Sequence, residues 1–348
     1  MPKIDLLLKY KNIRTLYKTP FQFWGITFFG QKKRLSKKDF NLLLEYKILI
    51  NYKQSKSKKC LLNNQKPLLK WVGSKKKQSS FIVSKVPSII DNYYEPFLGS
   101  ATILLELLLK INLGKITLRG NIYTSDLNPL LINFYNVIKL KVIKFSRFIK
   151  KILYVYNNLT TIECKSNFYY KMRDKLNNCN LESLSVKSAI LFYFINKSCF
   201  RGLYRTNKKG EFNVPFGNYC KINFDLNSFI EFYGLVKNVF FSCFNYVKCL
   251  SRVSEKDFIY LDPPYFGKKM FVDYLKMGFN YLEFFDFIKH LEIKNFTYLL
   301  SNILDKELLS IFSNKKYEIF YLEFLEGMIN KKEKRKEVLI SFRGNLKS

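Results

Sequence analysis

The sequence is poor in histidine, in paired cysteines and in long apolar runs, and each shortage excludes a class of protein. It has one histidine, His290, and seven cysteines without a C-x-x-C pair, so few residues could form a zinc site and we predict no metal requirement. No apolar run reaches the roughly 20 residues of a membrane helix, and the N-terminus lacks the zones of a secretory signal. We therefore expect reduced thiols and an intracellular protein of the cytoplasm or nucleoid, or of an organelle.

Acidic residues are also scarce. The 348 residues include 27 Asp and Glu against 60 Lys and Arg, which gives a net charge of +33. This excess favours a polyanionic partner, because lysines that neutralise phosphates release condensed counterions. An AT-rich coding sequence would give the same lysine-rich composition without selection for binding, so charge alone leaves nucleic-acid binding open. The 48% of hydrophobic residues provide a packed core and exclude a wholly disordered chain.

Residues 1–65 differ in composition from the rest of the chain. They carry fifteen basic and three acidic residues, and Lys53–Lys59 is typical of a linker. We expect a basic, poorly ordered N-terminal extension in which Leu35–Ile50 could form an amphipathic helix. Three roles stay open for it: holding DNA, directing the protein to an organelle, or none.

Strand and helix patterns alternate from Lys66 onward. The patterns predict helices at Thr102–Lys110 and Leu130–Lys141. They predict strands at Ile89–Pro96, Ile116–Thr124, Asp257–Leu261, Phe296–Leu300 and Glu337–Phe342. Residues 141–200 have a helical pattern, and Asn196–Tyr219 breaks it with Gly, Asn and Arg, as hairpins and loops do. This order predicts an α/β fold with a Rossmann-like sheet.

The tetrapeptide Asp262-Pro263-Pro264-Tyr265 follows an apolar strand directly. Ligands of open α/β sheets bind outside the carboxyl ends of strands, so the tetrapeptide would lie where chemistry happens. An exocyclic amine is a poor nucleophile until its lone pair is localised. The Asp262 carboxylate and the Pro263 carbonyl could accept its two N–H bonds, while Tyr265 stacks on the base. The alternative interpretation is a turn that merely ends a strand.

Two further features point to a nucleoside-type cofactor beside this amine acceptor. The turn Glu95–Ala101 contains Gly99, which lets the backbone approach a ligand closely. Asp126 ends the next predicted strand, where it could accept the two hydroxyls of a ribose.

These motifs together resemble those of the Dam-like, D12-class DNA adenine-N6 methyltransferases, in the family's own order from Lys66 to Phe342. Lys70–Lys75 resembles the family's K-W-x-G-G/S-K segment, and Ser301-Asn302 its S-N strand end. The most specific match is Asn196–Tyr219, NKSCFRGLYRTNKKGEFNVPFGNY, which is similar to the family's target-recognition segment.

The resemblance implies S-adenosylmethionine as the methyl donor and double-stranded DNA as the substrate. The residues that would contact the cofactor are Trp71, Lys75, Glu95, Pro96, Phe97, Gly99, Ser100, Asp126 and Asp262. Asp262, Pro263, Pro264 and Tyr265 would hold an adenine flipped out of the duplex. In the recognition segment Phe200 would be an aromatic wedge, Arg205 would contact guanine, Leu203 and Pro215 could meet thymine methyls, and Asn207 belongs to the same DNA-binding set. The implied target is GATC or a related GAT-containing site.

Three positions depart from the family's pattern. Ala101 replaces a usual glycine, so we expect it to crowd the cofactor loop; Lys197 replaces an arginine and Arg201 an asparagine. We expect a discontinuous catalytic domain of residues 66–140 and 250–345, a recognition domain of residues 141–249, and a monomer. No motif indicates a cognate restriction endonuclease.

Three other functions stay open. A cytosine-N4 methyltransferase uses related chemistry, although the Asp-first tetrapeptide with this recognition segment favours adenine. Methylation of a protein amide uses an Asn-first motif, and position 262 is Asp. A catalytically degenerate DNA-binding module would keep the basic surface and lose the transfer.

Overall fold

The computed structural model describes residues 66–179, 184–265, 279–328 and 331–344. The expected N-terminal extension, with the helix Leu35–Ile50 and the linker Lys53–Lys59, lies outside the described residues.

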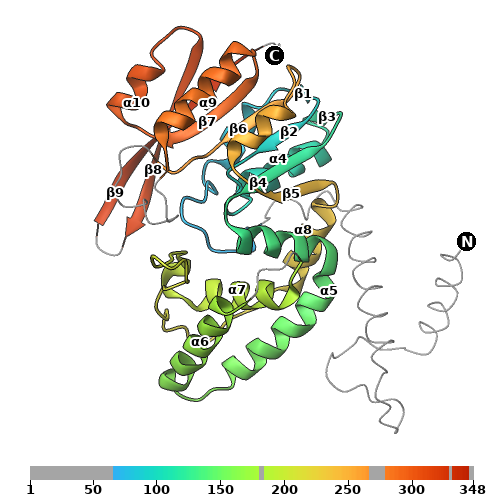
Figure 1. Cartoon of the computed structure of the whole chain (residues 1–348), viewed down its shortest axis with the longest axis vertical. Helices are drawn as coiled ribbons and strands as arrows, with labels where there is room; N and C mark the ends of the chain where they lie inside the picture. The colour runs from blue at the N-terminus through green and yellow to red at the C-terminus, as the bar shows by residue number, and fades with distance from the viewer. Residues whose placement is uncertain (1–65, 180–183, 266–278, 329–330, 345–348) are drawn as a thin grey trace, which may run out of the picture. The chain divides into compact units, whose positions relative to one another are not determined.

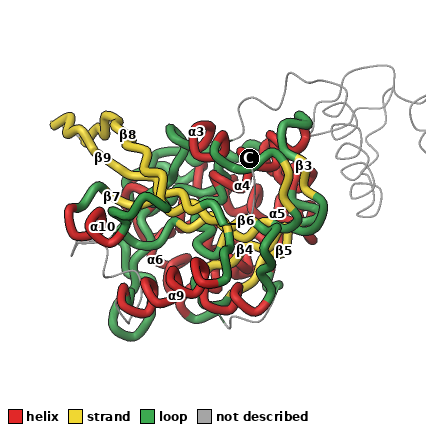
Figure 2. Tube along the Cα trace, turned by 90° about the horizontal axis from the view of Figure 1, so that it is seen from above, coloured by secondary structure: helices red, strands yellow, loops and turns green. Residues whose placement is uncertain are grey.

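A seven-stranded sheet forms the centre of the described structure (Figure 1), and it confirms the Rossmann-like α/β fold. Its order is β5-β4-β2-β6-β7-β9-β8. The strands are β2 (Tyr93–Glu95), β4 (Ile122–Asp126), β5 (Val239–Cys243), β6 (Phe258–Leu261), β7 (Thr297–Ile303), β8 (Tyr317–Met328) and β9 (Lys331–Phe342). The first five strands in this order are parallel, and β9 runs antiparallel to both β7 and β8. The paired ends of β8 and β9 project beyond the other strands in Figure 2.

The predicted strand Ile116–Thr124 is wrong as a single strand. The predicted strand Ile89–Pro96 is likewise wrong as a single strand, because it divides into β1 (Ile89–Ile90) and β2. Residues 116–124 divide into β3 (Thr117–Leu118), which pairs with β1, and β4, which joins the main sheet. Gly120 separates the two, and its N–H donates to the Asp91 carbonyl oxygen at 2.7 Å. A Cβ at this glycine would lie 2.3 Å from the Asn92 side chain, so only glycine fits the crossing.

The helices begin where the sequence predicts them and run further. The predicted helix Thr102–Lys110 is α4 (Thr102–Asn112). The predicted helix Leu130–Lys141 is the start of α5 (Pro129–Asn157), which passes Lys141 with a kink where φ is −138°. Asn128 caps α5, because its side chain accepts the N–H groups of the first turn at 3.0 and 3.1 Å.

The remaining helices are α3 (Ser79–Ser84), α6 (Ile162–Asn177), α7 (Val186–Ser198), η2 (Phe200–Gly202), α8 (Leu226–Leu235), η3 (Tyr246–Ser251), α9 (Tyr281–Ile293) and α10 (Lys306–Ile311). In Figure 1, α5, α6 and α7 form a helical group beside the sheet. The expected recognition domain of residues 141–249 would include β5, although β5 is a strand of the main sheet. None of the helices in the described ranges combines the length and apolar character that a membrane crossing demands.

The core follows the alternation of side chains along the strands. Tyr94, Ile259 and Leu261 pack in one apolar cluster with α9 residues such as Phe284 and Phe287. Tyr93 and Phe258, which directly precede Tyr94 and Ile259, are also buried, and their ring centroids lie 6.3 Å apart in a stacked arrangement. Successive side chains of a strand point to opposite faces, so both faces of this sheet are covered. In the described structure the strand ends are therefore the place to look for a ligand site.

Candidate active site

The carboxyl ends of β2, β4 and β6 meet at a cavity of about 450 Å³. This volume lies within the roughly 300–1,000 Å³ that is usual for small-molecule sites. The cavity is lined by all twelve residues that the sequence assigned to the cofactor or to catalysis: Trp71, Lys75, Glu95, Pro96, Phe97, Gly99, Ser100, Asp126, Asp262, Pro263, Pro264 and Tyr265. The fold therefore brings four separate segments of the chain to one place.

The turn after β2 is fixed by glycine geometry and by β4. Gly99 has φ +49°, and a Cβ there would lie 3.1 Å from two atoms of the Trp71 indole. Its N–H donates to Asp126 Oδ2 at 3.0 Å, and the Leu98 N–H donates to the Ser125 carbonyl oxygen at 3.0 Å. The turn thus brings the backbone close to Trp71, with the end of β4 beneath it.

Asp126 ends β4 in a position surrounded by backbone donors. Its carboxylate accepts the Gly99 N–H and the Asn128 N–H, the latter at 2.9 Å. Burial raises the pKa of Asp126, and the backbone hydrogen bonds oppose that rise. A carboxylate held this way is oriented before any ligand arrives.

Glu95 is the second carboxyl group of the cavity, and it is 2% exposed. Its Oε2 accepts the Tyr93 hydroxyl at 2.9 Å. Burial raises the pKa of Glu95 to about 8, despite this hydrogen bond. At neutral pH the group is therefore mostly protonated, unless a cation beside it favours the charged form.

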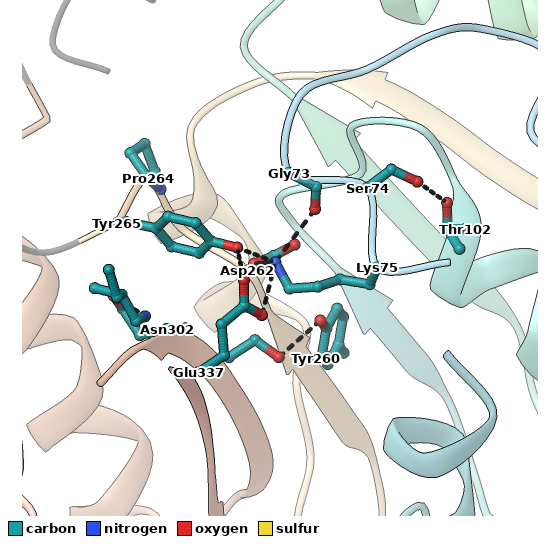
Figure 3. Close-up of polar contacts among 12 residues, drawn as sticks. Gly73, Ser74, Lys75, Thr102, Tyr260, Asp262, Pro264, Tyr265, Asn302 and Glu337 are labelled. Carbon is teal, nitrogen blue, oxygen red and sulfur yellow. Dashed lines mark hydrogen bonds and ion pairs between the residues drawn. The ribbon is translucent and has the colours of Figure 1, made fainter. Parts of the chain in front are cut away.

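Asp262 is held by a buried lysine (Figure 3). Lys75 Nζ lies 2.6 Å from Asp262 Oδ1 and donates to the Tyr265 hydroxyl at 3.0 Å. Burial acts to lower the pKa of Lys75, but Asp262, Tyr265 and Glu337 together raise it above its ordinary value. Burial raises the pKa of Asp262 to about 6 against the opposing effect of Lys75. At neutral pH the two side chains form an ion pair.

The two prolines place their neighbours rigidly, since neither can donate a backbone hydrogen bond. The Pro264 carbonyl oxygen accepts the Tyr281 hydroxyl from the first residue of α9. This contact ties the tetrapeptide to α9, beyond the segment 266–278 that the structure does not describe.

The recognition segment forms a loop region closed by two bridges, Cys199 to Phe216 and Thr206 to Phe212. Phe200 is 45% exposed, and its N–H donates to the Pro215 carbonyl oxygen at 2.9 Å. An exposed aromatic ring on a backbone that is hydrogen-bonded in place is suited to contact a partner.

The other predicted DNA contacts lie in the same region and outside the cavity lining. Arg205 is exposed and its Nε donates to Asn213 Oδ1 at 2.8 Å, while Leu203 is half-buried. Asn207 is used within the loop: its Oδ1 accepts two backbone N–H groups and its Nδ2 donates to Glu211. These contacts give Asn207 a part in shaping the loop.

Sequence reasoning missed residues that join the two parts of the site. Tyr204, Thr206 and Gly210 of the recognition segment also line the cavity. The Tyr204 ring stacks on Trp71 with centroids 5.8 Å apart. Glu337, on the distant strand β9, accepts the Tyr265 hydroxyl. Position in the recognition motif could have pointed to Tyr204; no local signal points to Glu337.

The expectation that Ala101 crowds the cofactor loop stays a prediction. Ala101 is fully buried at the start of α4 and does not line the described cavity. Its φ is +59° and that of Arg201 is +54°. Two of the three departures from the family pattern therefore fall at left-handed positions, which glycine and asparagine adopt most easily.

We expect Ala101→Gly to raise the free energy of unfolding by about 1 kcal/mol, because it removes left-handed strain that exceeds the added flexibility of the unfolded chain. Ala189→Gly is the matched control, since Ala189 is equally buried but lies inside α7. It should destabilise by about 1 kcal/mol. Urea unfolding of both variants measures the difference, and two changes of the same sign would contradict the strain argument.

Among the described residues no group of three or more His, Cys, Asp or Glu side chains is placed to hold a metal ion. The six described cysteines, Cys164, Cys179, Cys199, Cys220, Cys243 and Cys249, are all free.

Parallel strands with carboxylates at the ends of three neighbours, around a cavity of this size, are typical of a Rossmann-like enzyme. Residues 71–336 match the family described as D12 class N6 adenine-specific DNA methyltransferase. The chain belongs to this family. It is an adenine-specific DNA methyltransferase, an enzyme whose substrate is DNA and whose family takes its methyl group from S-adenosylmethionine.

Curated relatives agree with this assignment. The chain is 34% identical over 289 residues to the type II methyltransferase M.MjaIII of Methanocaldococcus jannaschii, covering 78% of this chain and 96% of that protein. It is 28% identical over 204 residues to the DNA adenine methylase of Escherichia coli strain K12, covering 59% of this chain and 66% of that protein. Among solved structures, a precorrin-6y C5,15-methyltransferase from Geobacter metallireducens GS-15 aligns with 80% of this chain and 100% of its own, at 9% identity and a TM-score of 0.32, too low to support any argument.

Proposed function

We propose that the protein methylates adenine N6 in duplex DNA within GATC or another GAT-containing site, by flipping the base into the cavity and transferring the methyl group directly. One observation carries the proposal: the Asp262 carboxylate, held by Lys75 at 2.6 Å, lies in the same cavity as Asp126 and the recognition-segment residue Tyr204. Methyl donor, target base and DNA-reading segment would thus meet at one place.

The residues that line the cavity support S-adenosylmethionine as its ligand. Asp126 would accept the ribose hydroxyls, and the indole of Trp71 beside Gly99 offers an apolar surface to the ligand. Glu95 is a buried carboxyl group that forms no ion pair with a lysine or arginine among the described residues. It is therefore suited to face the cationic part of the ligand. S-adenosylmethionine supplies a methyl group already activated by its sulfonium.

Asp262 and the Pro263 carbonyl would accept the two N–H bonds of adenine N6, which localises its lone pair toward the methyl group. The Tyr265 ring would stack on the base, with its hydroxyl held by Lys75 and Glu337. The adenine must leave the duplex to reach these groups, because its amine is otherwise paired. After transfer the proton would leave N6 through Asp262 or water. Orientation and electrostatics supply the catalysis, without a covalent enzyme intermediate.

Sequence reading would come from the recognition segment. Arg205 would contact O6 and N7 of guanine, and Leu203 and Pro215 would meet thymine methyl groups. The exposed Phe200 ring would fill or distort the base stack. We further propose that residues 141–249 act as the recognition domain, with β5 contributed to the catalytic sheet, and that the protein works as a monomer.

The test is transfer of labelled methyl groups from S-adenosylmethionine to two DNA duplexes, one with GATC and one with each such site scrambled. We expect label on adenine in the first duplex alone. Equal label in both would reject the specificity, and label on cytosine would reject the target atom. Folded protein that binds DNA without transferring label would make the chain a degenerate DNA-binding module.

Asp126→Asn should weaken the binding of S-adenosylmethionine about tenfold, because hydrogen bonds to a charged acceptor contribute about 1.5–3 kcal/mol. Isothermal titration calorimetry measures the change. Asp305→Asn is the matched control, since Asp305 also accepts two backbone N–H groups, at the start of α10 and outside the cavity. Equal affinities of the two variants would remove Asp126 from the cofactor site.

A further inference from the structure

Glu337 is a buried carboxylate that reaches the site from β9, two strands away from β6 in the sheet. It lies on β9, is 3% exposed, and pairs in register with Ile303 of β7 and Leu322 of β8. Because β9 runs antiparallel to β7, Glu337 lies at the same edge as the carboxyl ends of the parallel strands. It comes from none of the segments that carry the sequence motifs of the site.

Three contacts connect Glu337 to the residues that would hold the base (Figure 3). Its Oε1 accepts the Tyr265 hydroxyl, and its Oε2 lies 4.0 Å from Lys75 Nζ. Lys75 in turn contacts Asp262 at 2.6 Å. Two carboxylates therefore share one buried ammonium group, and the tyrosine hydroxyl bridges the ammonium to Glu337.

Burying a carboxylate in this arrangement costs folding free energy. Among the described residues Glu337 Oε2 has no hydrogen-bond partner although it is buried, and a buried acceptor left in this state costs about 1–3 kcal/mol. An apolar residue at this position of β9 would avoid the desolvation, as its neighbours Val338, Leu339 and Ile340 do. Packing of the sheet alone therefore does not account for a carboxylate here.

We propose that Glu337 is a positioning residue for methyl transfer: it anchors the Tyr265 hydroxyl and shares Lys75 with Asp262, and so fixes the ring and the carboxylate between which adenine is held. This proposal rests on the proposed function, because it takes the Asp262-to-Tyr265 turn as the adenine site. A base misplaced by about 1 Å can lose about 100-fold in rate, so fixing both groups has a direct kinetic value.

Charge gives the proposal a second consequence. The ionisable groups that face Asp262 are Lys75 before α3, Tyr260 within β6, Tyr265 after β6, Glu95 at the end of β2, and Glu337 on β9. Of these, Lys75 lowers the pKa of Asp262, and Glu337 raises it. Removing the negative charge of Glu337 should therefore move the protonation of Asp262 to lower pH.

The experiment measures single-turnover methyl transfer by the full-length protein to a GATC duplex across pH. We expect E337Q to slow transfer about tenfold and to shift the acid limb of the pH profile downward. E292Q is the matched control, because Glu292 also accepts tyrosine hydroxyls and pairs with Lys316, yet lies on α9 outside the cavity. E292Q should change neither the rate per folded molecule nor the acid limb.

A double variant tests the route through Tyr265. If Glu337 acts by holding that hydroxyl, E337Q and Y265F should overlap, and the double variant should be no slower than the slower single one. Any of three results would overturn the proposal. E337Q could transfer methyl groups as fast as E292Q, its acid limb could stay at the wild-type pH, or the rate losses of E337Q and Y265F could multiply in the double variant. If E337Q does not fold, E337D takes its place, because it keeps the charge and shortens the side chain. E337D should slow methyl transfer and leave the acid limb of the pH profile unmoved. Transfer at the wild-type rate would reject the positioning role of Glu337. Failure of the proposed function is distinct, since it would show as Asp262→Ala retaining full transfer.

Discussion

Replacing Asp262 by alanine is expected to lower the single-turnover rate of methyl transfer by about 100- to 1,000-fold, the usual effect of removing one preorganised group that stabilises a transition state. The carboxylate would accept a hydrogen bond from adenine N6, and the methyl group of alanine cannot accept one. The change also leaves the Lys75 ammonium with the more distant Glu337, at 4.0 Å, as its remaining carboxylate, beside the Tyr265 hydroxyl at 3.0 Å. Since breaking a buried ion pair costs about 3–5 kcal/mol, rates must be expressed per folded molecule.

The matched control for this experiment is Asp257→Ala, at the residue that directly precedes β6. Asp257 is fully buried and accepts the backbone N–H groups of Asn92 and Ser254 at 2.9 and 2.8 Å, at the end of β6 away from the cavity. It should lower stability and leave the rate per folded molecule unchanged. Equal rates for the two variants would reject Asp262 as the acceptor. In the unaltered enzyme the rate should fall as pH drops through about 6, because Asp262 then becomes protonated.

Replacing Arg205 by alanine is expected to reduce the preference for GATC over a site with the guanine changed by about 5- to 150-fold. A bidentate contact from arginine to guanine discriminates by about 1–3 kcal/mol, and alanine cannot make it. The guanidinium lies on the exposed side of the recognition loop, where Asn213 already orients its Nε at 2.8 Å. The ratio of kcat/KM for the two duplexes measures the change.

Lys209 provides the control because it is exposed in the same loop. A lysine that contacts phosphate binds all sequences alike, so Lys209→Ala should weaken binding to both duplexes and keep their ratio. If Arg205→Ala behaves in the same way, Arg205 contacts the backbone and the target sequence is read by other residues. The chemistry at Asp262 would be unaffected by that result.

The two experiments separate the enzyme from its specificity. Asp262 lies in the cavity with Lys75, whereas Arg205 lies in the loop outside the cavity lining. Tyr204 connects the two regions by stacking on Trp71. We therefore expect a variant of Arg205 to methylate other sites and a variant of Asp262 to bind its site without methylating it.

The sequence by itself determined the fold class and which carboxylates lie in the cavity. The predicted strands ended at or beside Glu95, Asp126 and Asp262, and parallel strands of one sheet bring their carboxyl ends to one edge. Local order in the chain was therefore enough to predict that these carboxylates meet. The family resemblance added the recognition segment, which no periodicity would have identified.

Only the tertiary structure decided which side chains support that cavity. Glu337 reads in the sequence as the start of a closing strand, and its contact with Tyr265 exists because β9 is inserted between β7 and β8 and runs against β7. The division of residues 116–124 into two strands likewise depends on the Asn92 side chain against Gly120. Hydrophobic periodicity reports which face of a strand is buried, whereas partner and direction are set by contacts between segments far apart in the chain.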